Sequence, residues 1–103
     1  MQTMNPVAEE SLLEDAALFF KVLGDHTRLR IMHSLIGTER CVHGVSDMLD
    51  LSHSAVSHHL SLLRRSKLVS HRREGKHIYY RLDDDHVETI LETALHHLTE
   101  QRT

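Results

Sequence analysis

The sequence predicts a mainly α-helical domain that carries one small β-hairpin. Three observations lead to this fold class: apolar residues recur at helical spacing in several stretches, two of these stretches are short and joined by a tight turn, and the apolar period changes to two after Leu68. With 103 residues the chain has the length of one small domain.

Two helices are expected in the first third of the chain. Residues 1–8 show no periodicity and include the only proline, Pro6, so we expect a flexible arm there and the single domain over 9–103. Apolar residues at helical spacing predict a first helix from Glu9 to Leu23, ended by Gly24. A second helix should follow over 29–36, with Asp25 or Thr27 as its N-cap and Gly37 at its end.

A helix-turn-helix is predicted over residues 43–66. Val45, Met48 and Leu49 mark its first helix, residues 50–53 form the turn, and Ser52 is a suitable N-cap for the second helix. The apolar face of the second helix leaves small polar groups on the solvent side: Ser54, Ser57, His58 and Ser61. A helix, a turn and a helix that shows such groups to solvent is the pattern of a helix-turn-helix.

The remaining elements are a hairpin over 69–82 and a last helix over 85–101. Alternating residues flank the Glu74-Gly75-Lys76 turn, which gives the hairpin a basic tip. In the last helix the apolar residues form one stripe: Val87, Ile90, Leu91, Ala94, Leu95 and Leu98. Helix, helix-turn-helix, hairpin and helix in this order make a winged helix-turn-helix.

The net charge of −3 conceals a basic block. Residues 51–82 carry seven basic side chains against one acid, whereas the rest of the chain carries five against fourteen. A basic block inside an acidic protein is typical of a nucleic-acid surface, and a solvated face is the alternative. On the exposed helix face and the wing we expect DNA contacts from Ser54, Ser57, His58, Ser61, Arg64, Arg72, Arg73 and Lys76.

The composition bears on location. No apolar run of membrane-spanning length and no secretory leader are visible, and the single cysteine, Cys41, cannot form an internal disulfide. We therefore expect a cytoplasmic protein without a membrane partner.

The last helix holds two pairs of metal-ligand residue types at its two ends, Asp84 with His86 and His97 with Glu100. His86 and His97 are eleven residues apart, or roughly 16 Å along a helix axis, whereas two ligands of one zinc ion lie only about 3 to 4 Å apart. One site made of all four residues would need a second, antiparallel copy of the helix. The spacing therefore predicts a two-fold homodimer with two equivalent sites.

Several motifs in this order resemble the ArsR/SmtB family of metal-sensing repressors. They are Phe20-Lys21-Val22-Leu23-Gly24-Asp25-His26-Thr27-Arg28-Leu29-Arg30, Glu39-Arg40-Cys41-Val42, the 51–60 segment, Gly75-Lys76-His77-Ile78-Tyr79-Tyr80, and the two ligand pairs of the last helix. The resemblance covers about residues 16–102. Within the family, the last helix is similar to that of the zinc and cobalt sensors.

The resemblance implies a bacterial repressor that dimerises through its N- and C-terminal helices. Ser54, Ser57 and His58 match residues that enter the major groove, and Arg72, Arg73 and Lys76 would lie on the DNA backbone or minor groove. Asp84 and His86 of one chain, with His97 and Glu100 of the other, would bind Zn(II), with Co(II) or Ni(II) as alternatives. Metal would release the operator and so derepress genes for metal efflux or sequestration.

The chain departs from the family pattern at a second metal site. Where the family has a Cys-x-Cys pair, this chain has Cys41-Val42-His43, and no cysteine precedes Cys41. We therefore interpret Cys41 as a small apolar residue, and a weak site at Cys41 and His43 stays open, as does a role for Asp83 or Asp85 in place of Asp84. Two other functions remain: a regulator of the same fold that ignores metal, and a small metalloenzyme. The enzyme is disfavoured because the sequence contains no His-Glu-x-x-His motif, nucleophile triad or glycine-rich phosphate loop.

Overall fold

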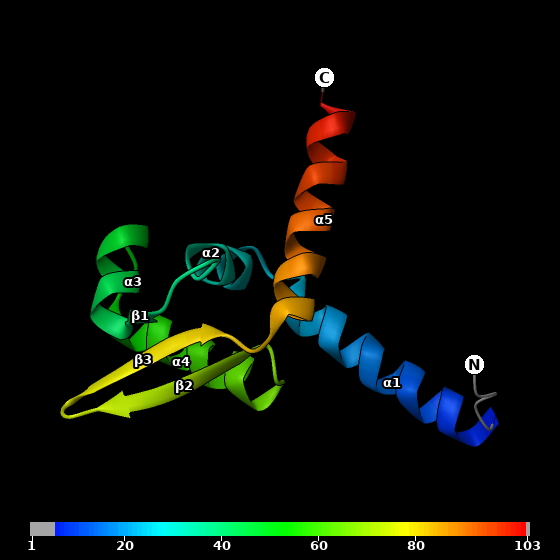
Figure 1. The fold of residues 1–103 in the computed structure, drawn as a ribbon, viewed down its shortest axis with the longest axis horizontal. Coiled ribbons are helices and arrows are strands. Elements are labelled where there is room, and N and C mark those ends of the chain that lie inside the picture. The colour runs from blue at the N-terminus through cyan, green and yellow to red at the C-terminus, as the bar shows by residue number, and fades with distance from the viewer. Residues whose placement is uncertain (1–5, 103) are drawn as a thin grey trace.

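The computed structural model describes residues 6–102, with side chains from residue 9. In this part of the chain the elements follow in the order α1–α2–β1–α3–α4–β2–β3–α5 (Figure 1). The helix-turn-helix and the sheet form the body, and α1 and α5 extend from it in different directions (Figure 1). None of the described helices is long and apolar enough to cross a membrane.

The first helix begins earlier than expected. α1 spans Pro6–Leu23, so residues 6–8 belong to the helix and the prediction that the whole of 1–8 is an arm was wrong for these three. Proline is well tolerated in the first turn of a helix, where its missing N–H has no partner to lose. Residues 1–5 of the predicted arm lie outside the described residues.

α2 spans His26–Ser34, and its N-cap is the first of the two expected candidates. The backbone N–H of Arg28 donates to Asp25 Oδ2 at 3.0 Å, and this hydrogen bond lowers the pKa of the Asp25 carboxyl. The chain then turns through Gly37, which has a φ of 72° that favours glycine.

The helix-turn-helix consists of α3, Val42–Leu49, and α4, His53–Arg65. Ser52 caps α4 as expected, because its Oγ accepts a 3.1 Å hydrogen bond from the backbone N–H of Ala55. The inward face of α4 is completely buried at Val56, Leu60 and Leu63. These three side chains anchor the core and leave the opposite face of α4 to solvent.

The wing has one strand more than the sequence indicated. β2, Val69–Glu74, and β3, His77–Leu82, form the expected hairpin, and Gly75 occupies its turn with a φ of 62°. The additional strand is β1, Arg40–Cys41, which pairs antiparallel with β3 and makes the strand order β1-β3-β2. β1 leads directly into α3, so the sheet joins the wing to the helix-turn-helix.

α5 spans Asp85–Gln101 and follows β3 closely. Val87 and Leu91 are the buried residues of this helix, and from residue 92 onward its described side chains are exposed. The outer half of α5 therefore extends away from the body (Figure 1).

Candidate DNA-binding surface and metal-ligand pairs

The outer face of α4 carries the side chains that the sequence singled out for base contacts. Ser54, Ser57 and His58 are exposed, as is Arg64 in the last turn, and Ser61 is half-buried. Because α4 presents short polar groups along its outer face and a cation at its C-terminal end, this face can approach base edges and phosphates together.

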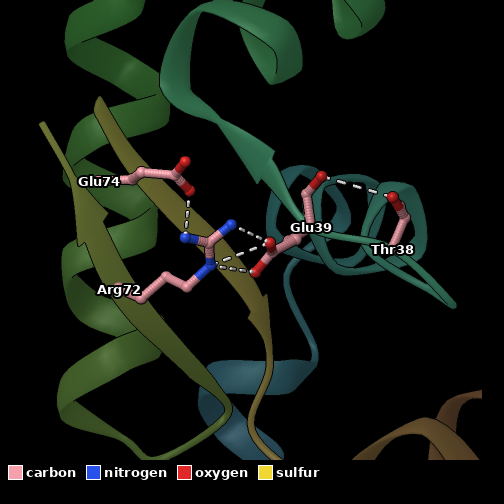
Figure 2. A network of polar contacts seen from close by, with 4 residues as sticks. All are labelled: Thr38, Glu39, Arg72 and Glu74. Carbon is pink, nitrogen blue, oxygen red and sulfur yellow. Dashed lines mark hydrogen bonds and ion pairs between the residues drawn. The ribbon is translucent and has the colours of Figure 1, made fainter. Parts of the chain in front are cut away.

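The three expected cations of the wing have different surroundings. In the described part of the chain, Arg73 and Lys76 are exposed near the hairpin turn and have no carboxylate partner. Arg72 instead donates to Glu39 and Glu74 (Figure 2). These hydrogen bonds lower the pKa of Glu39 and raise that of Arg72 further above its ordinary value.

A histidine pair lies across the helix-turn-helix. His43 Nδ1 is 3.3 Å from His53 Nε2, and His43 Nε2 is 3.3 Å from Asp47 Oδ2. The pair lines a pocket of about 290 Å³ between α3, α4 and the wing, together with half-buried Cys41. The contact was missed from the sequence because His43 and His53 are ten residues apart on two helices, and only the turn brings them together.

At the N-terminal end of α5, the first pair of expected ligands, Asp84 and His86, is in mutual contact. Asp84 Oδ2 lies 3.5 Å from His86 Nδ1, while Asp84 Oδ1 accepts a 3.0 Å hydrogen bond from the backbone N–H of Val87 and so caps the helix. That backbone hydrogen bond is the main reason why the pKa of Asp84 is lowered. The side chain of His86 is 93% exposed, which leaves its other ring nitrogen accessible.

The second pair lies near the C-terminal end of the same helix. His97 and Glu100 are both exposed and stand three residues apart, on one side of α5. Glu100 Oε1 is also 3.6 Å from His96 Nε2. Among residues 6–102 no three histidine, cysteine or acidic side chains of one chain come together in a way that could hold a metal ion. A site that uses both pairs thus needs a second chain.

An apolar groove runs along α5 between the two pairs. It has a volume of about 260 Å³ and is lined almost entirely by apolar side chains of α1, α2 and α5, among them Phe20, Leu23, Leu29, Ile90, Leu95 and Leu98. Phe20, Leu95 and Leu98 are each more than two-fifths exposed. An apolar surface of this kind on a small domain is typical of a protein interface.

Comparisons with known proteins agree with this geometry. Residues 25–71 match the arsR family of bacterial regulatory proteins. The chain is 41% identical over 87 residues to a transcriptional repressor SmtB homolog of Synechocystis, covering 84% of this chain and 66% of that protein. It is equally identical over 87 residues to a cadmium resistance transcriptional regulatory protein CadC homolog of Staphylococcus aureus, of which 72% is covered.

A solved structure confirms the fold class. The homodimeric winged helix-turn-helix DNA-binding domain of a possible ArsR-family regulator from Mycobacterium bovis superposes with a TM-score of 0.88 at 27% identity, covering 98% of this chain and 93% of that one. The relatives are transcriptional regulators and not enzymes, which confirms the prediction made against a metalloenzyme. The chain therefore belongs to the ArsR family of bacterial transcriptional regulators.

Proposed function

We propose that this chain is a metal-responsive repressor. In the proposal, a metal-free homodimer binds a palindromic operator, and Zn(II) at two sites between the chains releases it. The genes under its control would serve metal efflux or sequestration. Co(II) or Ni(II) could replace zinc, because imidazole and carboxylate ligands accept all three.

The observation that carries the proposal is the layout of α5. One helix holds a ligand pair at each end and lines an exposed apolar groove between them. If two copies of α5 pack antiparallel along this groove, Asp84 and His86 of one chain come next to His97 and Glu100 of the partner. Burial of the groove and completion of the metal sites then require the same dimer. The cadmium resistance regulator among the relatives gives independent support for a metal ligand.

The donor set suits a closed regulatory site. Two imidazoles and two carboxylates supply four nitrogen or oxygen ligands, the number that zinc takes in sites without an open position. When bound, the metal would link the two chains. Asp84 can contribute without losing its structural role, because Oδ1 caps α5 and Oδ2 faces His86. The neighbouring Asp83 and Asp85 have no contact with His86 of this kind, which favours Asp84 as the ligand.

The DNA-binding part of the proposal rests on α4 and the wing. Ser54, Ser57 and His58 would read base edges, while Ser61 and Arg64 would meet the adjacent backbone. Arg73 and Lys76 would neutralise phosphates, which adds affinity and salt dependence more than sequence readout. In a two-fold dimer the two α4 helices face successive major grooves only at a suitable separation, so an operator with two half-sites is expected.

A zinc titration of the DNA-bound protein tests the proposal. The duplex is one that the wild-type protein selects from a random-sequence pool. Zinc should weaken binding of the wild type at least tenfold, whereas His97→Ala should bind the duplex normally and ignore zinc. His96→Ala is the matched control: it removes an adjacent exposed imidazole whose one ion-pair contact among residues 6–102 is the 3.6 Å approach to Glu100. It should respond as the wild type does.

A regulator of the same fold that ignores metal is the second candidate. It is supported by the present contacts of the ligand residues, since Asp84 caps α5 and Glu100 approaches His96. If operator affinity of the wild type is the same with and without Zn(II), Co(II) and Ni(II), this second function is correct and the sensor is not.

A further inference from the structure

Arg72 lies between two carboxylates, Glu39 and Glu74, on the surface of the protein (Figure 2). Its Nε lies 3.0 and 3.1 Å from the two oxygens of Glu39, and a terminal nitrogen lies 2.6 Å from Glu39 Oε1. The other terminal nitrogen lies 2.5 Å from Glu74 Oε2. A forked guanidinium that grips a carboxylate with two nitrogens fixes the relative orientation of both side chains.

The Arg72–Glu39 pair spans the whole sheet. Arg72 lies on β2, Glu39 immediately precedes β1, and β3 runs between them. On β3, Tyr79 is the register partner of both Arg72 and Cys41, and the guanidinium carbon stands 4.9 Å from the centre of the Tyr79 ring. The pair therefore bridges the two outer strands over the aromatic ring of the middle strand.

The backbone pairing between β1 and the hairpin is short. β1 is two residues long and pairs with β3 at only those two positions, while the hairpin extends beyond them to its tip at Gly75. Since β1 continues directly into α3, this short pairing is one link between the wing and the helix-turn-helix, beside the buried Val69 and Leu82 at the base of the hairpin. A side-chain bridge from β2, the opposite edge strand, to the residue before β1 restricts movement of the wing relative to the helix-turn-helix.

The charge around Arg72 argues against a phosphate contact. Glu39 and Glu74 place two carboxylates on the Arg72 guanidinium, so its charge is already balanced within the protein and a phosphate would have to compete with these carboxylates. Arg73 and Lys76, the neighbouring cations without a carboxylate partner in the described chain, are better placed to neutralise phosphates.

We propose that Arg72 and Glu39 are a wing-positioning pair: they set the angle between the wing and the helix-turn-helix, and Arg72 does not bind phosphate. The proposal rests on the DNA binding of the proposed function and revises the expectation that Arg72 contacts the DNA backbone. It makes an acidic residue, Glu39, favourable for binding a polyanion.

Salt-dependent DNA binding separates positioning from phosphate contact. Each phosphate contact contributes about 0.9 to the slope of log Kd against log salt concentration, so a dimer that loses one contact per chain should lose roughly 1.8. We expect this loss for Arg73→Gln. Arg72→Gln should leave the slope unchanged and weaken binding by roughly two- to thirtyfold, the range given by one exposed Arg72–Glu39 pair in each of two chains. Arg72→Lys, which keeps the charge but not the fork, should behave like Arg72→Gln.

Variants of Glu39 change the DNA affinity in opposite directions, depending on whether Arg72 positions the wing or contacts phosphate. Glu39→Ala removes a negative charge from the wing, yet positioning predicts weaker binding, and Glu39→Ala/Arg72→Gln should be no weaker than the worse single variant. Tighter binding of Glu39→Ala, or a slope lowered by Arg72→Gln, would overturn the proposal.

Amide hydrogen exchange of the DNA-free protein provides a second measurement. Exchange of the amides that bond β1 to β3, within Arg40, Cys41, Tyr79 and Tyr80, should accelerate in Glu39→Ala and Arg72→Gln but not in Arg73→Gln, while the protected core amides of α4 show that all variants are folded. Equal exchange in all of them would also overturn the proposal. If the wild type selects no duplex, DNA binding itself fails, and the exchange experiment still decides whether the pair holds the wing.

Discussion

Replacing Leu95 and Leu98 with alanine is expected to weaken self-association of the chain about a thousandfold. The two side chains are 44% and 55% exposed in the single chain and line the apolar groove of α5. Complete burial of a leucine contributes about 1.5–3 kcal/mol, so burial of the remaining half contributes about 1 kcal/mol. Two leucines in each of two chains give roughly 4 kcal/mol, and each 1.4 kcal/mol is about tenfold in Kd.

Sedimentation equilibrium over a range of protein concentrations measures the monomer–dimer Kd directly. Met48→Ala is the control, because Met48 is 52% exposed but lies on α3, outside the groove. Both variants should keep the helical circular dichroism of the wild type, since neither replaces a buried residue. A change of less than tenfold for Leu95→Ala/Leu98→Ala, or an equal change for Met48→Ala, would refute the assignment of this groove to the dimer.

Three further predictions concern the core, the pH dependence and the cap of α5. Leu63→Ala empties a completely buried position and should lower the free energy of unfolding by about 2–5 kcal/mol in urea denaturation; a loss below about 1 kcal/mol would contradict the assigned core. Burial lowers the pKa of His59, because the charged imidazole is less favourable in the folded chain than in the unfolded chain. The folded state is therefore most stable above the ordinary pKa of 6.5 and loses stability as the pH falls below it. His59→Gln should make the melting temperature depend less on pH between about pH 7.5 and 5.5. The same pH dependence in His59→Gln and the wild type would contradict this. The lowered pKa values of Asp25, Glu39 and Asp84 act in a separate window, below their ordinary values of 3.8 to 4.5. Asp84→Asn should keep the cap of α5 and the wild-type melting temperature while weakening the zinc response, whereas Asp84→Ala should lose both; a wild-type zinc response in Asp84→Asn would remove this residue from the ligand set.

Local signals in the sequence were sufficient for most of the fold. Ser52 and Asp25 were identifiable as caps because capping involves residues only three positions apart. The apolar stripe of the last helix and the alternation around Gly75 are likewise repeated patterns within one element. β1 could not be predicted, since two residues are too few to show a period and the strand exists only through pairing with β3.

The features of the candidate site that could not be predicted from the sequence depend on contacts between residues far apart in the chain. The basic block includes Arg72, but its carboxylate partner Glu39 lies 33 residues earlier, and charge counting does not reveal which cations are neutralised. For the metal-ligand pairs the spacing along α5 was informative, because the geometry of a helix is enough to separate His86 from His97 and to require a second chain. The use of these pairs as ligands stays a prediction.

The N-terminal end of α5 is the point at which a movement at the proposed dimer interface would reach the proposed DNA-binding surface. Asp84 lies two residues after Leu82, the last residue of β3, and the backbone N–H of Asp83 donates to Leu68 O at the end of the helix-turn-helix. One turn into α5, Glu88 Oε1 accepts a 2.9 Å hydrogen bond from the backbone N–H of Gly37, two residues before Glu39. A displacement of this end of α5 therefore acts on both sides of the sheet, on the base of the wing through β3 and on the Arg72–Glu39 pair through the α2–β1 loop. The outer half of α5 has no buried residues to resist such a displacement, so in the proposed dimer the partner chain would set its direction.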